Sequence, residues 1–380
     1  MIESGLHDYL FDAIKSGASD LHVTVGLPPM IRVDGKVQPL EYPALTPNAT
    51  REMIYDVLSN EQRQRLENDW ELDIAYTLPR TARFRVNVYF QRGSLGAAFR
   101  TIPEKIPSFE ELGIPKAVEQ MAEKPRGLVL VTGPTGSGKS TTLASMVDKI
   151  NEQRHEHVMS VEDPIEFLHN HKNCIVNQRE VNQDTKSFAE ALKHILRQDP
   201  DVILVGEMRD LETISLAITA AETGHLVFAT LHTQDAPQTV DRIIDVFPSH
   251  QQTQVRAQLA IALQGIVTQT LVPQRDGKGR VIACEILVPT PGSRNLIREG
   301  KNHQIYSAMQ TGGKFGMQTM DAALVELVRE GEISREEAEK RSSNVDELKR
   351  LMGGDGTAAT ARQRGPGSPG TRPSGARETR

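Results

Sequence analysis

Cysteine, aromatic residues and long hydrophobic runs are all scarce in this sequence. The 380 residues include only two cysteines, Cys174 and Cys284, and no C-x-x-C pair, so neither a disulfide framework nor a cysteine zinc site is supported. No stretch approaches the roughly 18 consecutive apolar residues that suggest a membrane span. The start, MIESGLHDYLFDAI, lacks a basic region followed by an apolar run, so we expect no signal peptide and no direct membrane insertion.

A strong positive charge is also missing. The formal net charge is −6, which argues against a dominant nucleic-acid footprint, although a local basic groove stays open. Hydrophobic residues make up 38% and charged residues 25% of the chain, as is ordinary for a globular protein. The length allows two packed domains plus a tail.

The first part of the chain alternates short helix and strand signals and predicts a small α+β domain. Asp34-Gly35 between two extended runs indicates a β-hairpin. Apolar and polar residues alternate in RFRVNVYF, as in a strand with one buried face, and this strand is predicted to pair with Gly96–Thr101 in a hairpin. The predicted elements are helices at Glu3–Lys15 and Asn48–Leu66 and strands at Leu21–Val25, Met30–Val33, Lys36–Leu40, Arg83–Phe90 and Gly96–Thr101.

Two prolines in Ile102–Pro107 predict a linker, after which the pattern changes. Near-continuous apolar runs alternate with helical segments, which predicts a parallel sheet with crossover helices. The chain becomes mainly helical after Pro291, with a capping-box spacing from Ser334 to Glu337 and an acid–base pair between Glu336 and Lys340. Gly353–Arg380 has almost no large apolar residues, so we predict disorder there. The predicted parallel strands are Gly127–Thr132, His157–Val161, Val202–Val205 and His225–Leu231.

A phosphate-binding motif follows the first of these strands. Gly133-Pro-Thr-Gly-Ser-Gly-Lys139-Ser140 fits G-x-x-x-x-G-K-[ST] and opens a helical run, which is the context that the motif requires. Backbone N–H groups and the helix N-terminus would hold the phosphates, Lys139 would reach the β- and γ-phosphates, and the Ser140 hydroxyl would bind Mg²⁺. The predicted contacts to ATP are Gly133, Pro134, Thr135, Gly136, Ser137, Gly138, Lys139, Ser140 and Thr141.

Acidic residues follow two other strands. Val202–Val205 ends in Gly206-Glu207, which places a carboxylate at the carboxyl edge of the sheet, where ligands bind. We expect Glu207 to orient or deprotonate the attacking water. The alternative, a charge at a helix N-terminus, is less consistent with Gly206, which has no evident packing purpose in the sequence. A second cluster, Glu162–Glu166, contains Pro164 and is predicted to turn at the same edge.

His225 and His232 bracket the last of the parallel strands. Seven residues apart, they are expected at opposite ends and on opposite faces, where they cannot share a metal ion. His232, at the carboxyl end, is placed to sense the γ-phosphate, whereas a lone histidine in such a position is more often structural.

These four blocks in this order resemble the secretion ATPase superfamily, which includes the motors of type II secretion and type IV pili. LRQDPDVILVGEMRD is very close to the family signature, and the resemblance runs from about Ser19 to Met352. It implies a PAS-like α+β domain followed by a RecA-like P-loop ATPase domain with C-terminal helices. The implied boundaries are 1–101 for the N-terminal domain, 102–112 for the linker, 113–290 for the ATPase core, 291–352 for the helical region and 353–380 for the tail.

The resemblance also assigns roles to residues. It implies a hexamer in which ATP lies between the two domains, with catalytic acids at Glu166 and Glu207 and catalytic His232. Arg85 and Arg100 would contact the γ-phosphate, although without the resemblance they would be ordinary strand-face arginines. The remaining implied contacts are to the nucleotide from His225 and Arg209 and to Mg²⁺ through water from Glu162.

Within the family, the sequence is more similar to the pilus-retraction branch. The zinc-binding C-x-x-C pairs of the extension and secretion members are lacking, and Gly292–Glu299 keeps six positions of the retraction octapeptide Ala-Ile-Arg-Asn-Leu-Ile-Arg-Glu. The expected function is pilus retraction in twitching motility. The expected setting is the cytoplasm, peripheral at the inner face of the membrane, with a platform protein and a paralogous ATPase as partners. The alternatives are an accessory retraction paralogue, a secretion or pilus-assembly ATPase, a DNA translocase, or a regulatory module without turnover.

Overall fold

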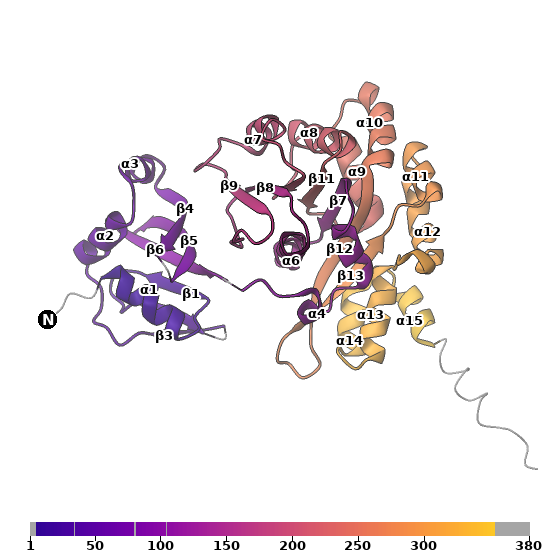
Figure 1. The fold of residues 1–380 in the computed structure, drawn as a ribbon. Coiled ribbons are helices and arrows are strands. Elements are labelled where there is room, and N and C mark those ends of the chain that lie inside the picture. Colours follow the sequence, from indigo (N-terminus) through magenta and orange to yellow (C-terminus); the bar gives the residue numbers. More distant parts are fainter. Residues whose placement is uncertain (1–4, 34, 80, 104, 354–380) are drawn as a thin grey trace, which may run out of the picture.

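The structure is a computed structural model that describes residues 5–353 except 34, 80 and 104 (Figure 1). Its first part is a six-stranded antiparallel sheet in the order β3-β2-β1-β6-β5-β4. The predicted hairpins and the pairing of Arg83–Phe90 with Gly96–Thr101 are confirmed, whereas β4 was not foreseen. The strands are β1 (Asp20–Val23), β2 (Met30–Val33), β3 (Lys36–Pro39), β4 (Glu71–Leu78), β5 (Ala82–Gln91) and β6 (Ser94–Ile102).

Strand β5 separates the two faces of this sheet by simple alternation. Phe84, Val86 and Val88 are fully buried in the N-terminal core. Because successive side chains of a strand point to opposite faces, Arg83 and Arg85 lie together on the other face. The alternation therefore gives β5 one apolar side in the core of its domain and one side that carries Arg83 and Arg85.

The predicted helix Asn48–Leu66 is wrong, because the chain forms two helices there. Helix α2 (Pro47–Asp56) ends before Ser59, and α3 (Asn60–Asp69) begins after it. The Ser59 hydroxyl accepts a hydrogen bond from the Gln62 N–H, and the Gln62 side chain accepts one from the Ser59 N–H. This reciprocal capping box starts a new helix. The remaining helix, α1 (Leu6–Lys15), confirms the described part of the first predicted helix.

The second sheet has seven strands in the order β13-β12-β7-β11-β10-β8-β9. All pairings are parallel except that of β12 with β13, which is antiparallel. The four predicted parallel strands are present, and β9, β12 and β13 were not predicted. The strands are β7 (Gly127–Thr132), β8 (His157–Glu162), β9 (Ile175–Glu180), β10 (Val202–Val205), β11 (Leu226–Leu231), β12 (Leu263–Pro273) and β13 (Arg280–Leu287).

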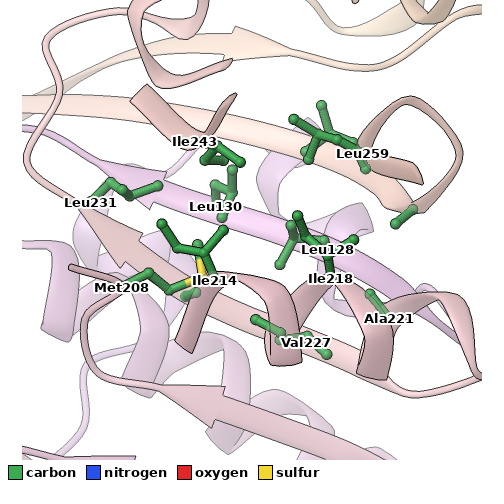
Figure 2. Close-up of a cluster of buried hydrophobic side chains, with 14 of the residues drawn as sticks. Leu128, Leu130, Met208, Ile214, Ile218, Ala221, Val227, Leu231, Ile243 and Leu259 are labelled. Atoms are coloured by element: carbon green, nitrogen blue, oxygen red, sulfur yellow. The ribbon is translucent and has the colours of Figure 1, made fainter. Parts of the chain in front are cut away.

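Helices cover both faces of this sheet. Leu128 and Leu130 of β7 pack with Ile214 of α8, Ile243 of α9 and Leu259 of α10 (Figure 2). The alternate residues of β7 pack on the other side, against α5 and α6. Burial on both faces explains the unbroken apolar runs. The helices are α4 (Phe109–Leu112), α5 (Lys116–Ala122), α6 (Lys139–Gln153), α7 (Phe188–Ile195), α8 (Leu211–Glu222), α9 (Ala236–Asp245) and α10 (Ser249–Ala262).

The chain after Pro291 is helical, as predicted. The Ser334 hydroxyl caps α14 by accepting a hydrogen bond from the Glu337 N–H. The predicted acid–base pair is also present, with Lys340 Nζ 3.0 Å from Glu336 Oε1. The predicted disorder of Gly353–Arg380 is wrong at Gly353, which is the last residue of α15, and residues 354–380 lie outside the described part of the chain. Among the described helices, none combines the length and apolarity needed to span a bilayer. The elements are α11 (Pro291–Arg298), α12 (Ile305–Thr311), α13 (Met320–Arg329), α14 (Arg335–Arg341), α15 (Val345–Gly353) and 3₁₀ turns at Asn302–Gln304 and Gly313–Phe315.

Candidate nucleotide-binding site

The phosphate-binding loop connects β7 to α6, as its motif predicts. The loop turns sharply at Gly133, Gly136 and Gly138, which have φ values of 136°, 78° and 89°. A Cβ atom on Gly133 would lie 2.3 Å from the carbonyl oxygen of Gln269. Glycine at 133 is therefore required both by the backbone conformation and by the close approach of β12.

Lys139 is the first residue of α6, and it is almost entirely buried. Its Nζ donates hydrogen bonds to the carbonyl oxygens of Gly133, at 2.9 Å, and Pro134, at 3.0 Å. Burial lowers the pKa of Lys139, and the negative charges of Glu207 and Glu166 act in the opposite direction. The ammonium group is thus held at the mouth of the loop with two carboxylates nearby.

A buried polar residue of the neighbouring strand β12 supports the loop. The side chain of Gln269, in β12, is fully buried and donates a hydrogen bond to the carbonyl oxygen of Ser137 at 2.8 Å. Nearby, the hydroxyl groups of Thr132 in β7 and Thr268 in β12 lie 2.8 Å apart. Gln269 was not predicted, because it lies between Thr268 and Thr270 and is only one of several polar residues in β12.

A cavity of about 510 Å³ opens beside the loop, and most of the predicted site residues line it. Its walls come from both sheets. The lining includes these predicted residues: Arg85, Arg100, Thr135, Gly136, Gly138, Lys139, Ser140, Thr141, Glu162, Glu166, Glu207, Arg209 and His232. Leu271 of β12 and Arg280 of β13 also line it and were not predicted, because the strands that carry them were not foreseen.

Glu207 follows β10 and enters the cavity at the carboxyl edge of the sheet. Its Oε1 lies 2.6 Å from Arg209 Nε and 3.4 Å from His232 Nε2. Burial raises the pKa of Glu207, but the hydrogen bond from Arg209 and the nearby His232 outweigh it, so this pKa lies below its ordinary value. Glu207 is therefore a carboxylate at neutral pH.

Gly206 has a packing role, contrary to the sequence interpretation. A Cβ atom there would lie 3.2 Å from both the Glu162 Cα and the Val161 carbonyl oxygen in the neighbouring strand β8. The close approach of the two strands therefore favours glycine at this position.

The acidic cluster after β8 turns at Pro164, whose peptide bond with Asp163 is cis. The Glu162 Oε1 accepts hydrogen bonds from Ser160 Oγ at 2.7 Å and Gln178 Nε2 at 3.1 Å. Burial raises the pKa of Glu162 in spite of these bonds. Among the described residues, no group of three histidine, cysteine, aspartate or glutamate side chains is arranged to hold a metal ion alone.

Arg85 and Arg100 face the cavity from the N-terminal sheet. They are direct cross-strand partners in β5 and β6, as the predicted hairpin requires. The Arg100 Nε donates a hydrogen bond to Asp20 Oδ1 at 3.0 Å, while the Arg100 side chain stays 70% exposed. Two guanidinium groups thus stand opposite the phosphate-binding loop.

Four other predicted contacts do not line the cavity. His225 precedes β11, whose opposite end leads to His232, and its Nδ1 lies 2.9 Å from the Ala220 carbonyl oxygen. His225 does not line the cavity. The two histidines are therefore at opposite ends of the strand, as predicted, but the structure places only His232 beside Glu207. Gly133 and Ser137 belong to the loop but do not line the cavity, and Pro134 lines a different cavity next to α9.

Residues 1–340 match the family described as Type II/IV secretion system protein. The chain belongs to this family. It is 55% identical over 328 residues to the type IV pilus retraction ATPase PilT of Pseudomonas aeruginosa, covering 86% of this chain and 95% of that protein. It is 44% identical over 339 residues to the type IV pilus ATPase PilU of the same organism, covering 89% of this chain and 88% of that protein.

A solved structure of the pilus retraction motor PilT with bound ADP has the same fold. The TM-score is 0.87 at 50% identity, and the match covers 92% of this chain and 100% of that chain. This secretion-family chain is accordingly an ATPase with an N-terminal domain and a RecA-like ATPase domain.

The helix α11 contains the segment that resembles the retraction octapeptide. Ser293, which replaces an apolar residue of that pattern, is buried and forms a reciprocal cap with Thr290. The Arg294 guanidinium donates hydrogen bonds to the carbonyl oxygens of Ala260 and Ile261 at the end of α10. Ile297 is fully buried. In this secretion-family ATPase the segment therefore packs against α10 in spite of the changes at Gly292 and Ser293.

Proposed function

We propose that this chain is the motor that hydrolyses ATP to power retraction of a type IV pilus. The observation that carries the proposal is the convergence in one cavity of Lys139, Glu207 and the arginine pair Arg85 and Arg100. The identity to PilT over nearly the whole of that protein supports the assignment to retraction.

Each group in the cavity would have its own role in hydrolysis. The loop N–H groups and Lys139 hold the β- and γ-phosphates. Glu207, ionised at neutral pH, orients the attacking water and accepts its proton, and His232 lies beside it. Arg85 and Arg100 approach the γ-phosphate from the other sheet and stabilise charge in the transition state. Arginines in this role are worth about 10³–10⁵ in rate.

Magnesium fits this site as a partner of the nucleotide. Mg²⁺ commonly takes one or two protein ligands together with phosphate oxygens and water, so a ready-made cage of carboxylates is not needed. The Ser140 hydroxyl would bind the ion directly, and Glu162 would hold one of its waters, because both line the cavity. The ion would neutralise charge on the β- and γ-phosphates.

We further propose that mechanical work comes from closure of the N-terminal domain, 1–101, on the ATPase core, 113–290, about the linker 102–112. A homohexamer would couple the closures of neighbouring subunits. The expected partners are an inner-membrane platform protein and a paralogous ATPase, and the expected place is the cytoplasmic face of the inner membrane. The similarity to PilU keeps an accessory retraction motor as a second candidate.

Replacement of Glu207 by glutamine tests the chemistry. Glu207→Gln is expected to bind ATP normally and to lower turnover by about 100-fold or more, since general-base catalysis contributes about 10²–10⁴. Glu212→Gln is the matched control, because Glu212 is exposed and pairs with Lys193 outside the cavity. Unchanged turnover in Glu207→Gln would defeat the assignment of Glu207.

A deletion strain tests the direction of the motor. Loss of this chain is expected to leave cells with surplus surface pili and without twitching. Loss of pili would instead indicate an assembly motor, and surplus pili with residual twitching would indicate an accessory one.

A further inference from the structure

A buried ion pair joins the two domains next to the candidate site. Arg83 of β5 donates a hydrogen bond from Nη2 to Oε2 of Glu180, at the end of β9, over 2.7 Å. The Arg83 side chain is 16% exposed and that of Glu180 is 4% exposed. Such a pair is weakly screened by salt, and removal of one partner leaves an uncompensated buried charge.

The same carboxylate also contacts the acidic cluster. The Glu180 Oε2 accepts a hydrogen bond from the Ile165 N–H at 3.2 Å, and Ile165 immediately precedes Glu166. Glu180 is the parallel-strand neighbour of Glu162. One carboxylate therefore connects the N-terminal sheet to the segment that carries two of the cavity's acids.

On the N-terminal side, the ion pair lies next to Arg85. Arg83 and Arg85 are two residues apart on one strand, so their side chains leave the same face. Phe84 between them is fully buried in the N-terminal core, which prevents the strand from rotating about its axis. A fixed Arg83 therefore fixes the base of Arg85.

We propose that the Arg83–Glu180 ion pair is the contact that seats the N-terminal sheet on the ATPase core and so positions Arg85 over the phosphate-binding loop. Arg83 is a positioning residue, because it acts through Arg85 and does not itself line the cavity. The inference rests on the proposed role of Arg85 in hydrolysis. It assigns a function to an arginine that the sequence motifs leave out.

Three variants test the proposal: Arg83→Met, which keeps the aliphatic stem, Arg83→Lys, which keeps the charge, and Glu180→Gln, which keeps an acceptor for Ile165. Arg83→Met is expected to lower kcat by about 10- to 100-fold, the scale of a misplacement near 1 Å. The KM for ATP and the affinity for fluorescent ADP should stay within about threefold, because the phosphate-binding loop is unchanged. Arg83→Lys should recover part of kcat. Glu180→Gln should resemble Arg83→Met.

A double variant separates positioning from a general loss of stability. In the Arg85→Ala background, Arg83→Met should have almost no further effect on kcat, because the group that it positions is gone. Arg51→Met is the control, since Arg51 forms an exposed 3.9 Å pair with Glu67 in the same domain. Thermal melts of all variants would check that they are folded.

The outcomes distinguish this inference from the proposed function. If Arg85→Ala keeps full turnover, the proposed role of Arg85 is wrong. If Arg85→Ala is slow but Arg83→Met turns over like the unmodified protein, only the positioning role is refuted. Effects of Arg83→Met and Arg85→Ala that multiply independently would also refute it, as would an equal loss of ADP affinity.

Discussion

The side-chain amide of Gln269 is fully buried and donates a 2.8 Å hydrogen bond to the backbone carbonyl of Ser137, in the middle of the phosphate-binding loop. A Cβ atom on Gly138 would lie 3.2 Å from the same amide nitrogen. Strand β12 therefore holds the loop in place through one side chain, and the two glycines at 133 and 138 allow the strand to come this close.

Loss of this support should weaken nucleotide binding. Gln269→Leu removes the side chain that donates to the Ser137 carbonyl oxygen. A buried polar group that loses its partner costs about 1–3 kcal/mol. The affinity for ADP, measured with a fluorescent analogue, is expected to fall about tenfold. Gln274→Leu, at the turn after β12, is the control and should bind ADP normally. Equal affinities in the two variants would contradict the supporting role of Gln269.

Arg100 should affect turnover without affecting assembly. Arg100→Ala removes a guanidinium that faces the phosphate-binding loop, so hydrolysis should slow by about 10³-fold or more. Size-exclusion chromatography with light scattering should show the same oligomer as the unmodified chain. Asp20→Asn, which weakens the 3.0 Å contact to Arg100, should have a smaller effect on turnover. If Arg100→Ala hydrolyses ATP at the normal rate, the two-sheet site is refuted.

Glu285 should make stability depend on pH. Burial raises the pKa of this carboxyl to about 7 from an ordinary 4.5, although its Oε1 accepts a hydrogen bond from the Ala236 N–H. Below pH 4.5 the group is protonated in the folded and unfolded states alike. Between pH 4.5 and 7 the unfolded chain ionises first, so the free energy of unfolding falls as pH rises, and above 7 the penalty is constant.

Glu285→Gln removes this penalty. The variant is expected to be more stable than the unmodified chain by about 3 kcal/mol at pH 8 and by about 1 kcal/mol or less at pH 5. Thermal melts at the two pH values measure the difference. Glu330→Gln, at an exposed position, should show no such pH-dependent gain. A gain that is the same at both pH values would show that ionisation of Glu285 is not its cause.

Arg294 should anchor the octapeptide segment. Arg294→Met removes the hydrogen bonds to the end of α10 and should lower the free energy of unfolding by about 1–2 kcal/mol, with ATP hydrolysis little changed. Arg298→Met is the control on the same helix, where the side chain is exposed. Chemical denaturation measures the difference. Equal stability of the two variants would contradict the anchoring role.

Much of the candidate site was predictable from local sequence patterns. The loop from Gly133 to Ser140 and the carboxylate of Glu207 each follow an apolar strand, and parallel strands bring their carboxyl ends to one edge. The arginine pair needed more than local pattern. A hairpin predicts that Arg85 and Arg100 are neighbours, but only the family resemblance places them at a phosphate in another domain.

The failures have physical causes. Helices α2 and α3 were merged because the capping signal at Ser59, with Gln62 three residues later, was overlooked. Strands β12 and β13 carry polar residues such as Gln269 and Glu285, so they do not read as continuous apolar runs. Gly206 was interpreted chemically, whereas its cause is a 3.2 Å approach from another strand, which no single-sequence pattern reveals. Interdomain contacts such as Arg83 with Glu180 are equally non-local.

The cavity has walls on two separate sheets, so the contacts that hold a ligand depend on the angle between the domains. In the proposed closure, a ligand that contacts both walls favours the closed arrangement, and by reciprocity a load that pulls the sheets apart weakens the binding of that ligand. An external force that separates the two sheets would therefore lower the affinity for the nucleotide. Stalling under load would then accompany faster escape of ligand from the strained subunits.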